Sequence, residues 1–317
     1  MKNKKILIIG GTGALGKTLT RRYFKDNTII VLSRDEHKHV SMKREFPEVK
    51  YCIGDVKDKH SILQTLNEHR PQVVINTAAL KHVPVCESNP YESVKTNIIG
   101  HKNLIDSIAI CTHQIETLMF ISTDKACLPI NVYGMCKAIS ERLYIDFANK
   151  QNDIKVVLCR YGNVLESTGS VIPFFKNLLE NKAKVLPVTD IRMTRFSITL
   201  EESVDLIDWT YRNSESHGCI VIPKLPSIKI VDLAKELAKS YGIEEMPLKI
   251  VGIRQGEKLH EDMISFEESL RCIEYDKYFL LTDKILFEPS KGYAYSSQNK
   301  VLSQQEVRQF LKEKGVI

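Results

Sequence analysis

The sequence predicts an α/β protein built on a doubly wound parallel sheet, with a smaller α+β lobe beside it. Through the first 160 residues, short apolar runs alternate with longer amphipathic segments, which is typical of repeated βαβ units. A glycine-rich turn directly follows the first apolar run. After Arg160 this rhythm gives way to shorter elements separated by prolines. These three observations together indicate the fold class.

Six apolar runs of the first half are expected to be strands. Most are rich in Ile and Val and apolar on both faces, as in strands that helices cover on both sides. They comprise residues 5–9, 28–32, 49–53, 73–75, 118–121 and 156–158. The clearest helix between them runs from about Pro90 to His113, with Ser88 or Asn89 as its cap. A second is expected from about Val132 to Lys150.

The second half predicts an irregular lobe. Helices are expected over residues 203–211 and 231–241, and Ser303 with Glu306 forms a capping box before a last helix that ends near Lys314. Residues 287–299, rich in Ser, Tyr and Lys, are expected to be a loop. We therefore expect a dinucleotide-binding domain at 1–165. Residues 166–317 would form mainly a substrate-binding lobe and tail, with the chain crossing between the lobes.

Composition excludes several classes of protein. The 317 residues contain 45 Lys and Arg against 39 Asp and Glu, a net charge of +6, and these charges are interspersed. The sequence has no run of Lys and Arg of the kind that binds nucleic acid. No apolar run approaches the ~20 residues that a membrane-spanning helix needs. The eight cysteines form no CxxC pair, so neither a metal site nor a disulfide framework is indicated. We expect a cytoplasmic protein that binds small phosphorylated anions.

The turn after the first strand reads Gly10-Gly11-Thr12-Gly13-Ala14-Leu15-Gly16. Glycines at this spacing allow a tight turn and bring the backbone close to a pyrophosphate, while the next helix offers free N–H groups. The pattern predicts a Rossmann-type dinucleotide site.

The second strand ends at Ser33-Arg34-Asp35-Glu36, where cofactor choice is usually made. An arginine accommodates a 2′-phosphate, so Arg34 with Ser33 favours NADP. Asp35 leaves NAD open, because an acidic residue here can bind a ribose hydroxyl. Asp55 after the third strand is a candidate for the adenine amino group, or simply a turn residue.

The segment Ser122-Thr123-Asp124-Lys125 lies at the carboxyl end of a predicted strand and precedes Tyr133 and Lys137. The last two are four residues apart and share one helix face. An ammonium and an oxidised nicotinamide near Tyr133 would lower its pKa from about 10, which would make the phenol a useful base. We therefore expect a catalytic site here.

The glycine loop, Asn76-Thr77-Ala78-Ala79, the Ser122–Thr123 pair and YxxxK together resemble the extended short-chain dehydrogenase/reductase family. More narrowly, the chain resembles the UDP-N-acetylglucosamine 4,6-dehydratase subgroup over roughly residues 5 to 265. The motifs that carry this are Ala79–Pro84, Ser122–Ala126, Arg160–Val164, Met193–Phe196, Pro223–Ser227 and Gly256–Glu261. Tyr133 and the absence of a membrane span are typical of the soluble forms that invert C-5.

The resemblance implies a set of roles. Tyr133 would remove the 4-hydroxyl proton, a deprotonated Lys125 would take the C-5 proton, and Asp124 would protonate the departing 6-hydroxyl. The catalytic candidates are Thr123, Asp124, Lys125, Tyr133 and Lys137. The cofactor candidates are Gly10, Thr12, Gly13, Ala14, Leu15, Gly16, Ser33, Arg34, Asp55, Val56, Ala78, Ala79, Lys81, Asn97, Tyr133 and Lys137. The substrate candidates are Lys81, His82, Thr123, Asn163, Val171, Arg195, Arg254 and Glu257.

Other interpretations remain open at this stage. The chain could be a 4-epimerase or a 5-retaining dehydratase acting on another nucleotide sugar, although Asp124-Lys125 argues against an epimerase. A cofactor-binding regulatory protein without catalysis is a third interpretation. Lys125 and His82 could each be ordinary loop residues. The resemblance also implies a homo-oligomer, commonly a hexamer, with a UDP-sugar as substrate and a tightly bound, recycled cofactor.

Overall fold

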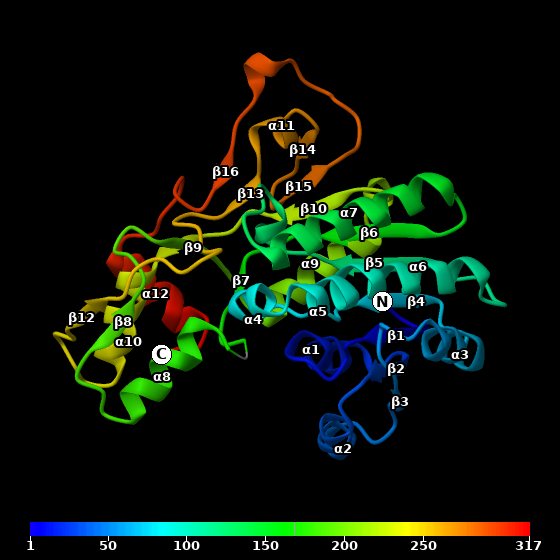
Figure 1. The fold of residues 1–317 in the computed structure, drawn as a ribbon, viewed down its shortest axis with the longest axis horizontal. Helices are drawn as coiled ribbons and strands as arrows, with labels where there is room; N and C mark the ends of the chain where they lie inside the picture. Colours follow the sequence, from blue (N-terminus) through cyan, green and yellow to red (C-terminus); the bar gives the residue numbers. More distant parts are fainter. Residues whose placement is uncertain (168) are drawn as a thin grey trace.

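The computed structural model describes residues 1–167 and 169–317. Its centre is a nine-stranded sheet in the order β14-β15-β10-β6-β5-β4-β1-β2-β3 (Figure 1). The run from β10 to β3 is parallel, β15 lies antiparallel to β10, and β14 lies antiparallel to β15. The strands of this sheet are β1 (Lys5–Ile9), β2 (Thr28–Ser33), β3 (Lys50–Ile53), β4 (Val73–Asn76), β5 (Thr117–Ile121), β6 (Lys155–Cys159), β10 (Ile220–Pro223), β14 (Cys272–Glu274) and β15 (Tyr278–Leu281).

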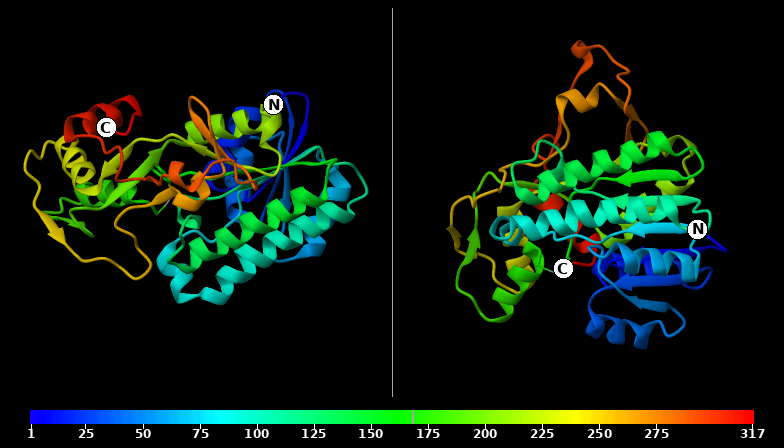
Figure 2. Two further views of the ribbon diagram at one scale, coloured as in Figure 1. Left: turned by 90° about the horizontal axis from the view of Figure 1, so that it is seen from above. Right: turned by 45° about the vertical axis from the view of Figure 1, so that its right-hand side comes forward.

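Helices cover both faces of the sheet, as its doubly apolar strands require (Figure 2). Helices α3 (Lys59–His69), α6 (Gly100–Ile110) and α7 (Val132–Lys150) pack on one face through side chains such as Leu104 and Tyr144. Helices α1 (Ala14–Tyr23), α2 (Glu36–Glu45) and α9 (Leu200–Arg212) pack on the other through Leu19, Met42 and Leu206. The predicted fold class is confirmed.

The long helix expected from Pro90 is continuous but contains a π-helical segment between two α-helical ones. It consists of α5 (Pro90–Val94), a π-helical segment (Lys95–Ile99) and α6, and follows the short α4 (Val83–Ser88). It ends at Ile110, short of the expected His113. The π turn carries Asn97, whose side chain is fully buried.

The smaller lobe lies beside the carboxyl ends of the parallel strands (Figure 1). Its core is formed by α8 (Val171–Glu180), α10 (Ile230–Ser240) and α12 (Gln304–Glu313), with contributions from the short strands. The predicted capping box of Ser303 and Glu306 is present at the start of α12. Val307 and Leu311 bury this last helix against the lobe, which assigns a structural role to the C-terminal tail.

Short strands complete the lobe. They are β7 (Asn163–Val164), β8 (Leu186–Val188), β9 (Thr194–Ile198), β11 (Ser227–Lys229), β12 (Leu248–Ile250), β13 (Asp262–Ile264) and β16 (Tyr295–Ser296). Strand β16 falls in the segment expected to be a loop and pairs with β13, so that expectation was wrong there. A two-residue strand leaves no alternation to detect. The remaining helices are α11 (Phe266–Ser269) and the 3₁₀ turns Asp124–Ala126, Ser214–Ser216 and Pro289–Lys291.

The chain passes between the lobes more than once. Strands β10, β14 and β15 and helix α9 follow residue 165 yet belong to the sheet and its cover. The boundary at residue 165 therefore stays a prediction.

A buried ionic cluster ties the last segments to the sheet. The Arg160 guanidinium donates to both carboxylate oxygens of Glu141, at 3.0 and 2.6 Å, and to both of Glu268, at 2.8 Å each. Arg160 is 1% exposed. Ser122 Oγ donates to the same Glu141 at 2.6 Å, so the cluster lies directly behind the end of β5. It connects β6, α7 and α11 and stabilises the edge of the sheet where the polar motifs lie.

Among the described residues, no helix is both long enough and apolar enough to cross a bilayer. The same residues include no group of three or more His, Cys, Asp or Glu side chains that could hold a metal ion.

Candidate active site

The glycine loop has the geometry of a phosphate cradle. Gly10 adopts φ +74°, and a Cβ atom there would lie 2.8 Å from the backbone of Ala78. A Cβ at Gly16 would lie 2.4 Å from Gly11. Gly13 is the N-cap of α1 and supplies no side-chain cap, so the first N–H groups of the helix are free of a capping side chain. These features fit a dinucleotide pyrophosphate.

The end of β2 is arranged around Arg34. Its guanidinium lies 3.7 Å from Asp55, and its side chain remains 57% exposed. Asp35 caps α2, accepting from the N–H of Lys38 at 3.1 Å. Asp55 accepts from the N–H of Lys57 at 3.0 Å, which is the turn role noted as its alternative. Thr12 Oγ1 and Ser33 Oγ are 2.7 Å apart, which joins the glycine loop to the end of β2. Val56, next to Asp55, is buried in the core.

Asn97 supports the loop after β4. Its Oδ1 accepts from the N–H of Leu80 and its Nδ2 donates to the Leu80 carbonyl, both at 2.8 Å. A third bond goes to Ser93 at 3.2 Å. The structure therefore gives Asn97 a role in holding the 78–81 loop, rather than a free amide to offer a cofactor. Lys81 and His82 are exposed at the end of this loop.

The catalytic candidates meet at the carboxyl end of β5. Thr123 begins a 3₁₀ turn, Asp124–Ala126, and its hydroxyl donates to Asp124 Oδ1 at 2.9 Å. Lys125 Nζ donates to the same oxygen at 3.0 Å and lies 3.5 Å from Asn163 Oδ1. Asp124 is fully buried and its Oδ2 has no partner. The turn thus places an acid and a candidate base side by side.

The two carboxylates beside Lys125 favour its ammonium form as long as both are ionised. Burial acts to lower its pKa, but the carboxylates of Asp124 and Glu261 outweigh burial and raise that pKa above its usual range. The deprotonated Lys125 that the base role needs therefore stays a prediction. Lys125 must lose a proton before it can act as a base.

Tyr133 and Lys137 both point inward from α7. Burial raises the pKa of Tyr133 to about 12, even though Lys125 acts to lower it. The expected lowering is absent from the protein by itself. Lys137 donates to the carbonyl of Ile121 and lies over the ring of Phe120, and burial lowers its pKa to about 7. The positive charge that would favour a phenolate must come largely from Lys125 and from a bound cofactor.

Sequence reasoning missed Glu261. Its carboxylate Oε1 lies 3.4 Å from Lys125 Nζ and 3.9 Å from Arg195 Nε, and the residue is 2% exposed. It stood in the Gly256–Glu261 motif without an assigned role. The sequence carried no other signal, because only the packing of the segment before β13 against the Asp124–Ala126 turn brings it here.

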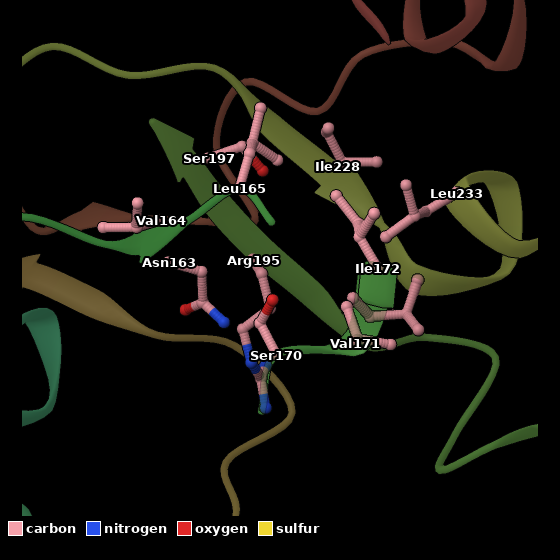
Figure 3. Close-up of a pocket in the computed structure, with 11 residues that line it drawn as sticks. Asn163, Val164, Leu165, Ser170, Val171, Ile172, Arg195, Ser197, Ile228 and Leu233 are labelled. Carbon is pink, nitrogen blue, oxygen red and sulfur yellow. The ribbon is translucent and has the colours of Figure 1, made fainter. Parts of the chain in front are cut away.

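Three substrate candidates line one small cavity. Asn163, Val171 and Arg195 face a space of about 30 Å³ together with mostly apolar side chains of the lobe (Figure 3). This volume holds about one water molecule. Arg195 donates to the main-chain carbonyls of Thr194, Leu259 and Lys258 at 2.7 to 3.0 Å. Its guanidinium therefore holds the 258–259 backbone with part of its donors, and the expected contact of Arg195 with the substrate stays a prediction.

Arg254 and Glu257 lie on an adjacent turn. Glu257 accepts from the N–H of Arg254 at 3.1 Å, and Arg254 is exposed. Asn131 caps α7 through Gly134 and also donates to the Gly256 carbonyl at 2.8 Å, which attaches this turn to the catalytic helix. The ring of His82 packs against Gly169. A Cβ atom built at Gly169 would lie 2.3 Å from Cε1 of that ring.

Comparison with known proteins adds a family. Residues 6–283 match the family described as polysaccharide biosynthesis protein. A Campylobacter jejuni protein named UDP-N-acetylglucosamine 4,6-dehydratase (inverting) is 43% identical over an alignment of 329 positions, which covers 95% of each chain. A Rickettsia felis protein named UDP-glucose 4-epimerase is 35% identical over 98% of this chain and 95% of its own.

Solved structures show the same fold. Pen from Bacillus thuringiensis matches with a TM-score of 0.90 at 31% identity, covering 100% of this chain and 99% of its own. A dTDP-glucose 4,6-dehydratase from Streptomyces venezuelae and a UDP-glucose 4-epimerase from Stenotrophomonas maltophila, both solved with NAD, match at 18% and 16% identity with TM-scores of 0.70 and 0.68, a likeness of fold alone.

Proposed function

The chain belongs to the polysaccharide biosynthesis protein family, among the extended short-chain dehydrogenases/reductases, and from this premise we propose that it is a UDP-N-acetylglucosamine 4,6-dehydratase that inverts C-5. The product would be a UDP-2-acetamido-2,6-dideoxy-L-arabino-hexos-4-ulose. The observation that carries the proposal is the contact between the buried Asp124 and the half-buried Lys125 at the end of β5, since dehydration needs an acid and a base together.

The cofactor would lie on the glycine loop. The bare backbone of Gly10 and Gly16 and the uncapped start of α1 fit a nicotinamide dinucleotide, which would take a hydride from C-4 and return it to C-6. We favour NADP over NAD because Arg34 is exposed at the end of β2 while Asp35 is occupied as a helix cap. Identification of the nucleotide released on heating the purified protein tests this choice.

The chain's own groups divide the proton transfers. Tyr133 takes the 4-hydroxyl proton as C-4 is oxidised, and the resulting ketone acidifies the C-5 proton. Lys125 takes that C-5 proton once it is neutral, and Asp124 in its acid form protonates the 6-hydroxyl so that it leaves as water. A proton added from the opposite face of the ring then sets the L configuration.

The second lobe would supply part of the binding site for the UDP-sugar. Arg254 is a candidate for the diphosphate, because a guanidinium matches phosphate geometry and this one is exposed beside Glu257. Lys81, His82 and Asn163 would lie near the sugar. Arg195 donates to main-chain carbonyls and so helps to hold the site together.

The experiment that tests the function is proton NMR of the product formed from UDP-N-acetylglucosamine in heavy water. We expect loss of water, deuterium at C-5 and the L configuration. A product of unchanged mass would mean an epimerase, the activity named for the 35% identical relatives. A D configuration would mean a retaining dehydratase, and cofactor binding without any 4-keto product would mean a regulatory protein.

A further inference from the structure

Glu261 reaches the active site from the last third of the chain. Its N–H donates to Ser297 Oγ at 2.9 Å, and its carbonyl accepts from the N–H of Ser297 at 2.8 Å. These bonds fix the backbone on both sides of the carboxylate. The side chain is therefore held in place by the β13–β16 segment, independently of β5 and α7.

Two buried carboxylates flank one ammonium. Lys125 Nζ lies 3.0 Å from Asp124 Oδ1 and 3.4 Å from Glu261 Oε1. The second oxygen of each carboxylate, Asp124 Oδ2 and Glu261 Oε2, is buried and has no hydrogen-bond partner within residues 1–167 and 169–317. A buried ionised oxygen without a donor is costly, so Glu261 Oε2 is a natural position for a proton.

Four charged groups face Glu261. Lys125 and Asp124 come from the 3₁₀ turn after β5, Arg195 from β9, and Lys258 from the same segment as Glu261. Arg195 and Lys258 are already hydrogen-bonded to main-chain carbonyls. The state of Glu261 therefore acts most directly on Lys125.

Resting on the function proposed above, we propose that the charge of Glu261 decides whether Lys125 can serve as the base. When Glu261 is ionised, Lys125 is held as an ammonium between two anions. When Glu261 carries a proton, Lys125 passes one proton from Nζ to Asp124 Oδ1. This single transfer gives a neutral amine and a carboxylic acid, so that the base and the acid form together.

The protons of the elimination step balance between Lys125 and Asp124. The amine takes the C-5 proton and becomes an ammonium, while Asp124 gives its proton to the departing 6-hydroxyl and becomes a carboxylate. The pair has then returned to its starting charges, and Glu261 has kept its proton throughout. No further reactant is needed for these steps.

The surroundings of Glu261 favour the protonated form. Burial raises the pKa of its carboxyl; Lys125 opposes this effect and Asp124 adds to it, with a net rise. As pH rises through that raised value, Glu261 ionises and Lys125 is held as an ammonium. Activity that depends on a neutral Lys125 should then fall on the alkaline side.

The test is Glu261→Gln, which keeps the shape of the protonated acid but cannot ionise. We expect the alkaline fall of kcat/KM to move upward by at least one pH unit. Where the wild-type protein has lost most of its activity, the variant should exceed it about tenfold, since a single ionisation changes a rate about tenfold per pH unit. An unchanged pH profile overturns the proposal. So does a folded variant that is inactive at every pH, because Glu261 would then be needed as an anion.

Glu236→Gln is the matched control. Glu236 is also 2% exposed, and its Oε2 has no hydrogen-bond partner among the described residues, but it lies on α10 and pairs with Lys239 and Arg308. Its pH profile should equal that of the wild type, and comparing the Tm values of the two variants separates a folding defect from a change of ionisation.

A second readout separates this inference from the proposed function. NMR of ¹⁵N-lysine-labelled protein without substrate should show the Lys125 amine titrating at lower pH in Glu261→Gln. A lowered titration with no dehydratase product would sink the function and leave the coupling standing. Normal dehydratase product together with an unshifted Lys125 titration would exclude the coupling between Glu261 and Lys125 and leave the proposed function standing.

Discussion

At the scale of single residues, Lys125 is the centre of the site. Its ammonium touches Asp124, Glu261 and Asn163, so its replacement removes the shared partner of two buried acids. For Lys125→Met we expect kcat to fall about 10² to 10⁴-fold, the usual contribution of a general base. Deuterium incorporation at C-5 in heavy water, followed by mass spectrometry, should fall with it.

The control for this change is Lys224→Met, which removes a lysine paired with Glu274 at the surface. It should leave C-5 exchange and turnover unchanged. Undiminished exchange in Lys125→Met would exclude Lys125 as the base.

The sequence could predict the residues of the site that lie in local motifs. Thr123, Asp124 and Lys125 follow a strand directly, and Tyr133 and Lys137 share a helix turn. Glu261 could not be found this way, because its place depends on the pairing of β13 with β16 across a long stretch of chain. Arg195 was predicted to contact the substrate, but the sequence could not show that its guanidinium also donates to three main-chain carbonyls.

At the scale of elements, the turn between β1 and α1 depends on Gly10. Gly10→Ala places a Cβ atom 2.8 Å from the backbone of Ala78 at φ +74°. We expect loss of cofactor binding, because either the turn or the Ala78 loop must move. Fluorescence titration with the nicotinamide dinucleotide measures the change, and the Kd should rise more than tenfold.

Gly242→Ala is the control for that substitution. Gly242 has nearly the same φ, +78°, but nothing lies within 4 Å of its Cβ position. It should cost about 1 kcal/mol of stability from the left-handed backbone and leave cofactor binding unchanged. Equal loss of binding in both variants would mean that backbone strain, and not the close approach, is the cause.

A second prediction concerns the start of α7. Asn131 caps the helix through its Oδ1 and holds Gly256 through its Nδ2. Asn131→Asp keeps the cap but loses the donor to Gly256, so the Arg254 turn loses one attachment. We expect KM for the UDP-sugar to rise about fivefold, the value of one hydrogen bond of ~1 kcal/mol, with little change in Tm. A fall in kcat with unchanged KM would contradict this role.

The elements predicted from sequence were mostly the long ones. The six strands of the first half lie within one or two residues of the expected positions, because strands buried on both faces give uninterrupted apolar runs. Helix α7 has the expected bounds. Strand β16 was missed, and the π turn at Lys95–Ile99 could not be foreseen, because neither leaves a periodic pattern.

At the scale of the whole molecule, the Arg160 cluster should make the free energy of unfolding decrease as pH falls into the acid range. Burial alone would raise the pKa of Glu268, but the Arg160 guanidinium dominates and lowers it to about 2. A carboxyl with a lowered pKa contributes stability above its unfolded value of about 4.5, and this contribution is lost as pH falls toward 2. For Glu268→Gln we expect a loss of about 3 to 5 kcal/mol at pH 7, because Arg160 loses a buried partner.

Urea unfolding at a series of pH values measures this contribution. The difference between wild type and Glu268→Gln should shrink steadily between pH 4.5 and 2. Glu274→Gln serves as the control, since Glu274 pairs with Lys224 but is 63% exposed; it should cost less than about 1 kcal/mol. A constant difference across the acid range would exclude ionisation of Glu268 as the cause.

The order of strands in the central sheet has a consequence for synthesis on the ribosome. The parallel strands are all translated once β10 has emerged, but β15, which covers the open edge of β10, is made only after most of the second lobe. The nascent chain therefore carries an unpaired, apolar strand edge during that interval, and such edges promote aggregation. Slow translation or scarce chaperones should reduce the soluble yield of this protein even when the finished fold is stable.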